Sequence, residues 1–119
     1  MSLTIYHNPR CSKSRKTLEI IQDAGVTPTI IEYLSKPPTA DRILHLASLL
    51  EMPVQELLRR NEAQFEAARD LPDLNDDAAL AAWVASNPKV LERPIVVDDE
   101  ANKAVVGRPP ENVHDLLAE

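Results

Sequence analysis

The sequence predicts an α/β fold, and its distribution of apolar residues carries this prediction. Short β-branched and aromatic runs occur towards both ends of the chain, while helical spacing of apolar residues dominates the middle. The chain has 119 residues, of which 44% are apolar, and this suffices for one compact core. No linker, internal repeat or low-complexity segment interrupts it. We therefore expect a single domain over residues 1–119.

The first third of the chain has the pattern of a strand, a helix and a second strand. Residues 3–6 (LTIY) predict a short strand, which the polar segment HNPRCS ends. From Ser12 to Ala24 apolar residues recur at helical spacing, and Gly25 is a suitable stop. Residues 29–34 (TIIEYL) are rich in β-branched and aromatic side chains. A strand–helix–strand unit of this length implies a crossover connection and therefore parallel strands.

The middle of the chain predicts helices only. Helix-capping residues and prolines divide it, and apolar residues lie on one face of each segment. We expect a helix capped by Thr39, one from Pro53 to near Asn61, a weaker one over 62–70, and one opening at Asp76 or Asp77 and closing at Asn87-Pro88.

The last part of the chain predicts a hairpin followed by a helix. Residues 94–98 (PIVVD) and 103–106 (KAVV) flank the polar DEAN stretch, and Pro109 begins a helix that carries Val113 and Leu116. The predicted order is therefore β-α-β, a helical middle and β-β-α. This is the order of a thioredoxin-like (glutaredoxin-like) core with a helical insertion, over about 39–87, between its βαβ and ββα halves.

Composition excludes several classes of function. A net charge of −6 with only 3% aromatic residues argues against a nucleic-acid-binding surface. Two glycines leave no glycine-rich phosphate loop, and three widely spaced histidines do not form a metal-binding pattern. Neither a signal peptide nor a run of roughly 18 apolar residues is present. We expect a soluble cytoplasmic protein that binds no metal and no membrane.

Cys11, the only cysteine, lies between the first strand and the first helix. The unpaired N–H groups and the dipole of a helix N-terminus favour a thiolate over a thiol. Arg10, Lys13 and Arg15 add cationic charge within four residues, and His7 can add more. Such a setting lowers a cysteine pKa from about 8.5 to roughly 3.5–7.5. We therefore predict a reactive thiolate at Cys11.

The same helix N-terminus predicts a site for a tetrahedral oxyanion. Its N–H groups can hold the anion, with the hydroxyls of Ser12 and Ser14 as further donors. A lone cysteine is most often a small buried hydrophobe, but the polar neighbours of Cys11 argue against that role. A cysteine phosphatase needs an arginine six positions after the cysteine, where this chain has Thr17.

The absence of a second cysteine determines how the enzyme would turn over. An oxidised or adducted Cys11 has no internal thiol to resolve it. Turnover then needs an external thiol such as glutathione and, after it, a disulfide reductase.

Three arginines stand out by position, although each could also be an ordinary surface cation paired with one of many carboxylates. Arg59 ends a predicted helix, Arg93 precedes the strand PIVV, and Arg108 follows AVVG. In a thioredoxin-like fold, the place of Arg93-Pro94 carries a cis-proline that faces the active cysteine. A bond that precedes proline is the only kind for which the cis form is cheap.

These spaced motifs resemble the ArsC family of glutaredoxin-dependent arsenate reductases nearly end to end. The motifs are IYHNPRCSKSRKTLEII, EYLSKPPT, LLRRN, ERPIVV and GRPPENV, and HNPRCSKSR with GRPPE is most similar to a reductase-like branch. Many arsenate reductases instead read NPxCGTSRNT. The resemblance implies that the Cys thiolate attacks arsenate, that glutathione displaces the adduct, and that arsenite leaves with the help of glutaredoxin.

The resemblance also implies roles for particular residues. The nucleophile matches Cys11, the arginines that stabilise arsenic and thiol match Arg59, Arg93 and Arg108, and the histidine that helps to hold the thiolate matches His7. Together with the local analysis, this predicts a substrate-binding set of His7, Asn8, Arg10, Ser12, Ser14, Arg15 and Pro94.

The predicted function is arsenic detoxification by an arsenate reductase that uses glutathione as co-substrate and has no bound cofactor. Its expected partners are arsenate or a similar oxyanion, glutathione and glutaredoxin. One alternative is a glutathione-dependent thiol–disulfide reductase with another substrate. Another is a non-enzymatic regulator similar to the Spx proteins, which bind RNA polymerase. Many Spx proteins carry a CxxC motif, and this chain has Ser14 where the second cysteine would be.

Overall fold

The computed structural model describes residues 2–59 and 62–117, which form two compact units. The first unit combines the N-terminal part of the chain up to Lys36 with the C-terminal part from Arg93. The second unit spans Pro37–Glu92.

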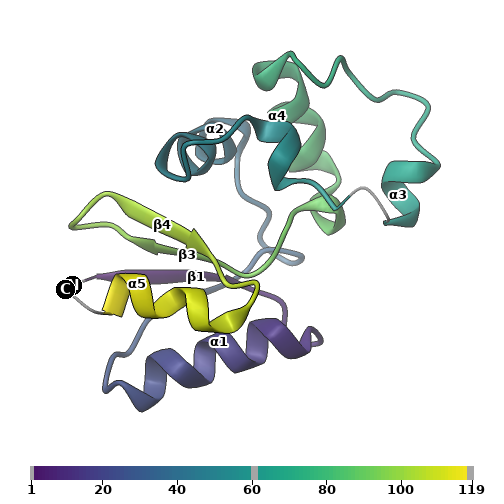
Figure 1. Cartoon of the computed structure of the whole chain (residues 1–119). Helices are drawn as coiled ribbons and strands as arrows, with labels where there is room; N and C mark the ends of the chain where they lie inside the picture. Colours follow the sequence, from purple (N-terminus) through teal and green to yellow (C-terminus); the bar gives the residue numbers. More distant parts are fainter. Residues whose placement is uncertain (1, 60–61, 118–119) are drawn as a thin grey trace. The chain divides into compact units, whose positions relative to one another are not determined.

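The first unit is built on a four-stranded sheet with the order β2-β1-β3-β4 (Figure 1). Its strands are β1 (Leu3–His7), β2 (Thr29–Glu32), β3 (Ile95–Asp98) and β4 (Lys103–Val106). β1 pairs with β2 in parallel, as the predicted βαβ unit requires, while the β1–β3 and β3–β4 pairs are antiparallel.

Helices α1 (Ser12–Asp23) and α5 (His114–Leu117) lie on one face of this sheet (Figure 1). A 3₁₀ turn, η3 (Pro110–Val113), leads into α5. Alternate residues of the strands meet these helices because successive side chains of a strand point to opposite faces. The resulting core contains Leu3, Ile5, Ile21, Val96, Val113 and Leu116. It anchors the loop between β1 and α1, which carries Cys11.

The second unit is the helical insertion. It contains α2 (Ala40–Leu49), η1 (Val54–Leu57), α3 (Ala63–Glu66), α4 (Asp77–Ser86) and η2 (Pro88–Val90). The N-caps are those that the sequence predicts: Thr39 accepts from the Arg42 N–H, and Asp76 accepts from the Ala79 N–H. Helices α2 and α4 pack against each other through fully buried side chains, among them Ile43, Leu46 and Leu80.

The predicted α/β fold class, a thioredoxin-like core with a helical insertion, is confirmed. The helix predicted from Pro53 to near Asn61 is wrong, because only η1 forms and Leu58 is extended. The Arg59 N–H donates to the Val90 oxygen, and Leu58 bridges to Leu91, so backbone pairing replaces the helical hydrogen bonds. The predicted end near Asn61 lies outside the described residues.

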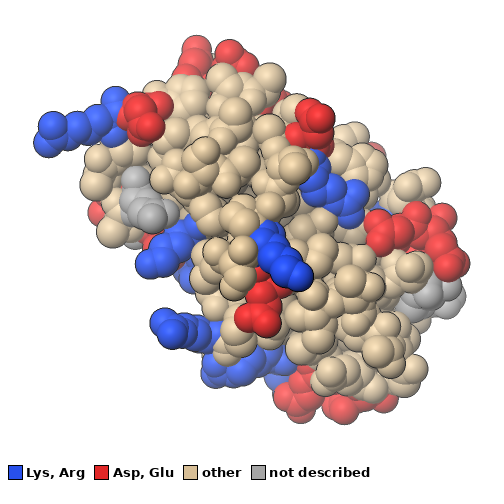
Figure 2. Space-filling model, turned by 180° about the vertical axis from the view of Figure 1, so that it is seen from behind, with Lys and Arg blue, Asp and Glu red and all other residues tan. Residues whose placement is uncertain are grey.

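The helix predicted over 62–70 is also too long, because α3 ends at Glu66 and Ala67 is its C-cap. The organisation of residues 1–119 as a single domain stays a prediction. Within the described residues, no helix combines the length and the hydropathy that crossing a bilayer requires. On the face that Figure 2 shows, Lys and Arg lie in separate groups among other residues.

Candidate active site

Cys11 is the N-cap residue of α1, at the end of the loop that leaves β1. Backbone hydrogen bonds fix this loop: the Cys11 N–H donates to the Asn8 oxygen at 3.0 Å, and the Arg15 N–H donates to the Cys11 oxygen at 3.0 Å. The Asn8 Oδ1 accepts from the Arg10 N–H at 3.0 Å. The loop therefore holds the half-buried Cys11 against the first turn of α1.

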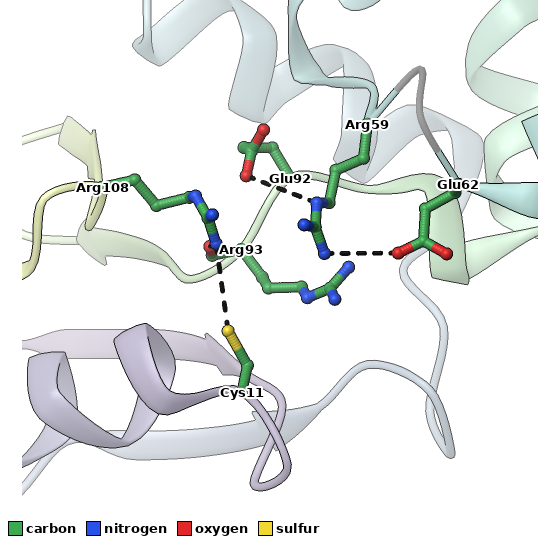
Figure 3. A network of polar contacts seen from close by, with 6 residues as sticks. All are labelled: Cys11, Arg59, Glu62, Glu92, Arg93 and Arg108. Atoms are coloured by element: carbon green, nitrogen blue, oxygen red, sulfur yellow. Dashed lines mark hydrogen bonds and ion pairs between the residues drawn. The ribbon is translucent and has the colours of Figure 1, made fainter.

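The surroundings of the Cys11 sulfur favour its thiolate. Burial alone raises the pKa of Cys11, but the backbone N–H groups of Ser14 and Lys13 and the Arg93 guanidinium outweigh it, so the net pKa is below that of an ordinary thiol. Arg108 Nη1 lies 3.9 Å from the sulfur (Figure 3). Two guanidinium groups and two helix N–H groups thus converge on one sulfur atom.

The β3–β4 pair brings Arg93 and Arg108 to this place. Ile95 of β3 is paired with Val106 of β4. Arg93 lies two residues before Ile95 and Arg108 two residues after Val106, so both arginines lie at the same end of the hairpin. Arg108 Nη1 also donates to the Arg93 oxygen at 3.4 Å. The Arg93–Pro94 peptide bond is cis, as expected for a thioredoxin-like fold, and the Gly107 N–H donates to the Pro94 oxygen at 2.9 Å.

His7 and Ser14 form a buried polar pair behind the loop. His7 Nδ1 and Ser14 Oγ are hydrogen-bonded at 2.6 Å. In addition, the Asn8 N–H donates to Ser14 Oγ at 3.0 Å. Burial lowers the pKa of His7; the Glu32 carboxylate opposes this effect and Arg15 supports it. This lowered pKa disfavours the cationic form of His7, and with it the additional positive charge that the sequence suggested.

Ser14 therefore has a different place from the one expected for its hydroxyl. Its side chain is fully buried and bonded to His7 and the Asn8 N–H, while its own N–H interacts with the Cys11 sulfur. Among the other predicted substrate-binding residues of the loop, Asn8 is buried, whereas Arg10, Ser12 and Arg15 are exposed. Arg10 and Ser12 flank Cys11, and Arg15 Nη1 donates to the Pro9 oxygen at 2.9 Å.

Arg59 belongs to the second unit. Its Nη1 lies 3.3 Å from Glu62 Oε1, and its Nε lies 4.0 Å from Glu92 Oε1 (Figure 3). The guanidinium is therefore held by two carboxylates of the same unit. Its action on the Cys11 adduct stays a prediction from the family resemblance.

Two positions next to the site were not found from the sequence. Gly107 contacts Thr17 of α1 so closely that a Cβ would lie 2.6 Å from Thr17 Oγ1. Glu32 is opposite His7 in the register of β1 and β2. The sequence did contain a signal for Gly107, because this chain has only two glycines and one of them directly precedes Arg108.

Within the described part of the chain, no group of three or more His, Cys, Asp or Glu side chains could hold a metal ion. The site instead consists of a cysteine with cationic and N–H donors around its sulfur, which lower its pKa and so favour the thiolate. Such a site can attack an electron-poor centre and can stabilise negative charge near the sulfur.

Comparison with known proteins gives consistent matches over nearly the whole chain. The model of the ArsC family matches residues 6–116. Protein YfgD of Escherichia coli (strain K12) is 40% identical over 114 residues, which cover 95% of this chain and 94% of YfgD. An arsenate reductase of Escherichia coli is 40% identical over 116 residues, which cover 98% of this chain and 81% of that enzyme.

The similarity extends to solved structures. The arsenate reductase from Vibrio cholerae superposes with a TM-score of 0.84 at 38% sequence identity. The superposition covers 97% of each chain. At this identity, the likeness extends to the sequence as well as the fold.

Proposed function

Because this chain belongs to the ArsC family, we propose that it is a thiol-dependent oxidoreductase that reduces arsenate to arsenite. The observation that carries the proposal is the surroundings of Cys11, where Arg93, Arg108 and the first turn of α1 stabilise a thiolate. The relatives named as arsenate reductases indicate the substrate. The two arginines also supply positive charge for an oxyanion that approaches the sulfur.

In the proposed reaction, the Cys11 thiolate attacks arsenate and forms a sulfur–arsenic bond as water leaves. A first thiol then attacks the Cys11 sulfur, so that the sulfur–arsenic bond breaks, its electron pair stays on arsenic and arsenite leaves from a mixed disulfide at Cys11. A second thiol attacks this mixed disulfide, which releases the disulfide product and restores the Cys11 thiolate. With glutathione as the thiol, the balanced reaction consumes arsenate and two glutathione molecules and yields arsenite, glutathione disulfide and water. Since the chain contains no second cysteine, glutathione acts as co-substrate and glutaredoxin as the reductase that closes the cycle.

We place this reaction in the cytoplasm, where thiols are kept reduced. Arg93 and Arg108 are proposed to stabilise the arsenic adduct, and Arg59 is given the same role from the family resemblance. The enzyme is proposed to need no bound cofactor.

A coupled assay tests the proposal by following NADPH consumption with arsenate, glutathione, glutaredoxin and glutathione reductase. Cys11→Ser should abolish turnover, and Arg93→Ala should reduce it more than Lys89→Ala, which removes an exposed cation of η2. The absence of arsenate-dependent NADPH consumption with any glutaredoxin supplied, or more than a tenth of wild-type activity in Cys11→Ser, would contradict the proposal. A glutathione mixed disulfide in place of arsenate tests the alternative substrate, and a pulldown with RNA polymerase tests the regulator.

A further inference from the structure

A cavity of about 320 Å³ opens beside the active-site loop. One wall comes from the end of β1 and the loop after it, with His7, Asn8 and Arg10; the other comes from the end of β2 and the turn after it, with Glu32, Leu34 and Ser35. The volume falls in the range of sites for small molecules. Cys11 does not line the cavity itself, but it directly follows the lining residue Arg10, so the cavity borders the loop that carries the nucleophile.

The cavity carries two opposite charges on its two walls. Arg10 and Glu32 are both exposed, and within the described residues their side-chain charges form no ion pair. Asn8 and Ser35 add neutral polar groups, and Leu34, which is 39% exposed, adds apolar surface. A matching ligand carries an ammonium and a carboxylate close together on a short apolar stem.

This combination is the head of an α-amino acid. We propose that the cavity binds the γ-glutamyl group of glutathione, with Glu32 receiving its α-ammonium and Arg10 its α-carboxylate. The inference rests on the proposed function, because the single cysteine makes an external thiol necessary. The cysteinyl residue of glutathione is joined to the γ-glutamyl group by one amide bond, and Cys11 directly follows the cavity residue Arg10, so a γ-glutamyl group in the cavity would place the thiol of glutathione at the loop that carries Cys11.

Binding can be measured without any reaction. S-methylglutathione forms no disulfide, so its titration followed by the NMR shifts of backbone amides reports binding alone. We expect shifts at residues 8–10 and 34–35, and an affinity about fivefold lower in Glu32→Gln. Glu19→Gln is the matched control, because Glu19 is exposed in the same unit and pairs with Lys16 at 3.8 Å, but does not line the cavity.

Changing the ligand gives a second, independent arm. S-methylcysteinylglycine lacks the γ-glutamyl group and should bind at least fivefold more weakly to the wild-type protein. Free glutamate, which has the head without the thiol, should shift the same amides. Shifts elsewhere, equal affinities of Glu32→Gln and Glu19→Gln, or equal binding of the two S-methylated peptides would each overturn the inference.

The outcomes separate this inference from the proposed function. Binding of S-methylglutathione that depends on Glu32, in a protein without arsenate turnover, would support the cavity and contradict the reductase. Arsenate turnover together with equal affinities of Glu32→Gln and Glu19→Gln would support the reductase and contradict the cavity.

Discussion

A side chain at position 107 has no room between α1 and the loop before β3. A Cβ added to Gly107 would lie 2.6 Å from Thr17 Oγ1 and 2.8 Å from Pro94 Cγ. Ordinary contacts are about 3.5–4.0 Å, so the first would be roughly 0.9 Å too short. In Gly107→Ala the helix and the loop must move apart, and we expect the free energy of unfolding to fall by about 1–3 kcal/mol.

Urea denaturation followed by far-UV circular dichroism measures this loss. The same displacement moves Arg108, the next residue, away from the Cys11 sulfur. Because Arg108 donates to that sulfur at 3.9 Å, the pH midpoint of Cys11 alkylation should also rise in Gly107→Ala.

A double-mutant cycle with Thr17→Ala isolates the steric cause. Thr17→Ala alone removes the hydroxyl that donates to the Lys13 oxygen at 2.8 Å and should cost about 1 kcal/mol. In the double variant the clash with Thr17 is gone and only the contact with Pro94 remains. Its loss of stability should be smaller than the sum of the single losses by about 1 kcal/mol. Additive losses, or an unchanged stability of Gly107→Ala, would refute the reasoning.

Three further predictions concern charge and hydrogen bonding in the first unit. The rate of Cys11 alkylation against pH should have its midpoint below the value of about 8.5 for a free thiol, and Arg93→Ala should raise it; a wild-type midpoint at 8.5 would contradict the proposed thiolate. Ser14→Ala should lower the free energy of unfolding by about 1–3 kcal/mol, since it leaves the Asn8 N–H without its acceptor, whereas Ser12→Ala at an exposed position should change it little. The pKa of Asp98 is lowered, because burial raises it but the N–H groups of Ala101, Ser2 and Glu100 lower it more. The ionised carboxylate therefore stabilises the fold at pH values above the unfolded-state pKa, and this stabilisation is lost as the pH falls through the folded-state pKa. Asp98→Asn should therefore lose stability at pH 7, and the difference from wild type in urea denaturation should shrink towards pH 3; an equal difference at both values would argue against this role.

Local sequence patterns predicted the elements that local interactions stabilise. The Asp76 cap and the apolar spacing after it gave α4, and the β-branched runs gave the strands of the sheet. The predicted helix from Pro53 failed because residues about 30 positions apart in the chain decide the outcome there. The Glu92 N–H donates to the Leu57 oxygen at 2.6 Å, and no local pattern reveals that pairing.

The same distinction applies to the candidate site. The position of Cys11 at the start of a helix follows from the order of a strand, a polar break and a helical pattern. The approach of Arg108 to the sulfur depends on the β3–β4 register, and the family resemblance supplied what spacing alone could not. Glu32 was missed because only the parallel register of β1 and β2 places it opposite His7.

The place of Ser14 fits the proposed dependence of this site on an external thiol. The Ser14 N–H serves the Cys11 sulfur, while its side chain is fully buried and accepts from the Asn8 N–H. A cysteine at position 14 would replace that acceptor with a weaker one and would be buried where the hydroxyl now lies. In the proposed reaction, a resolving thiol would therefore reach Cys11 from the solvent side, where Arg10 and Ser12 are exposed. The cavity beside Arg10 opens on the same loop, which is why we propose it as the place that holds the molecule with the thiol.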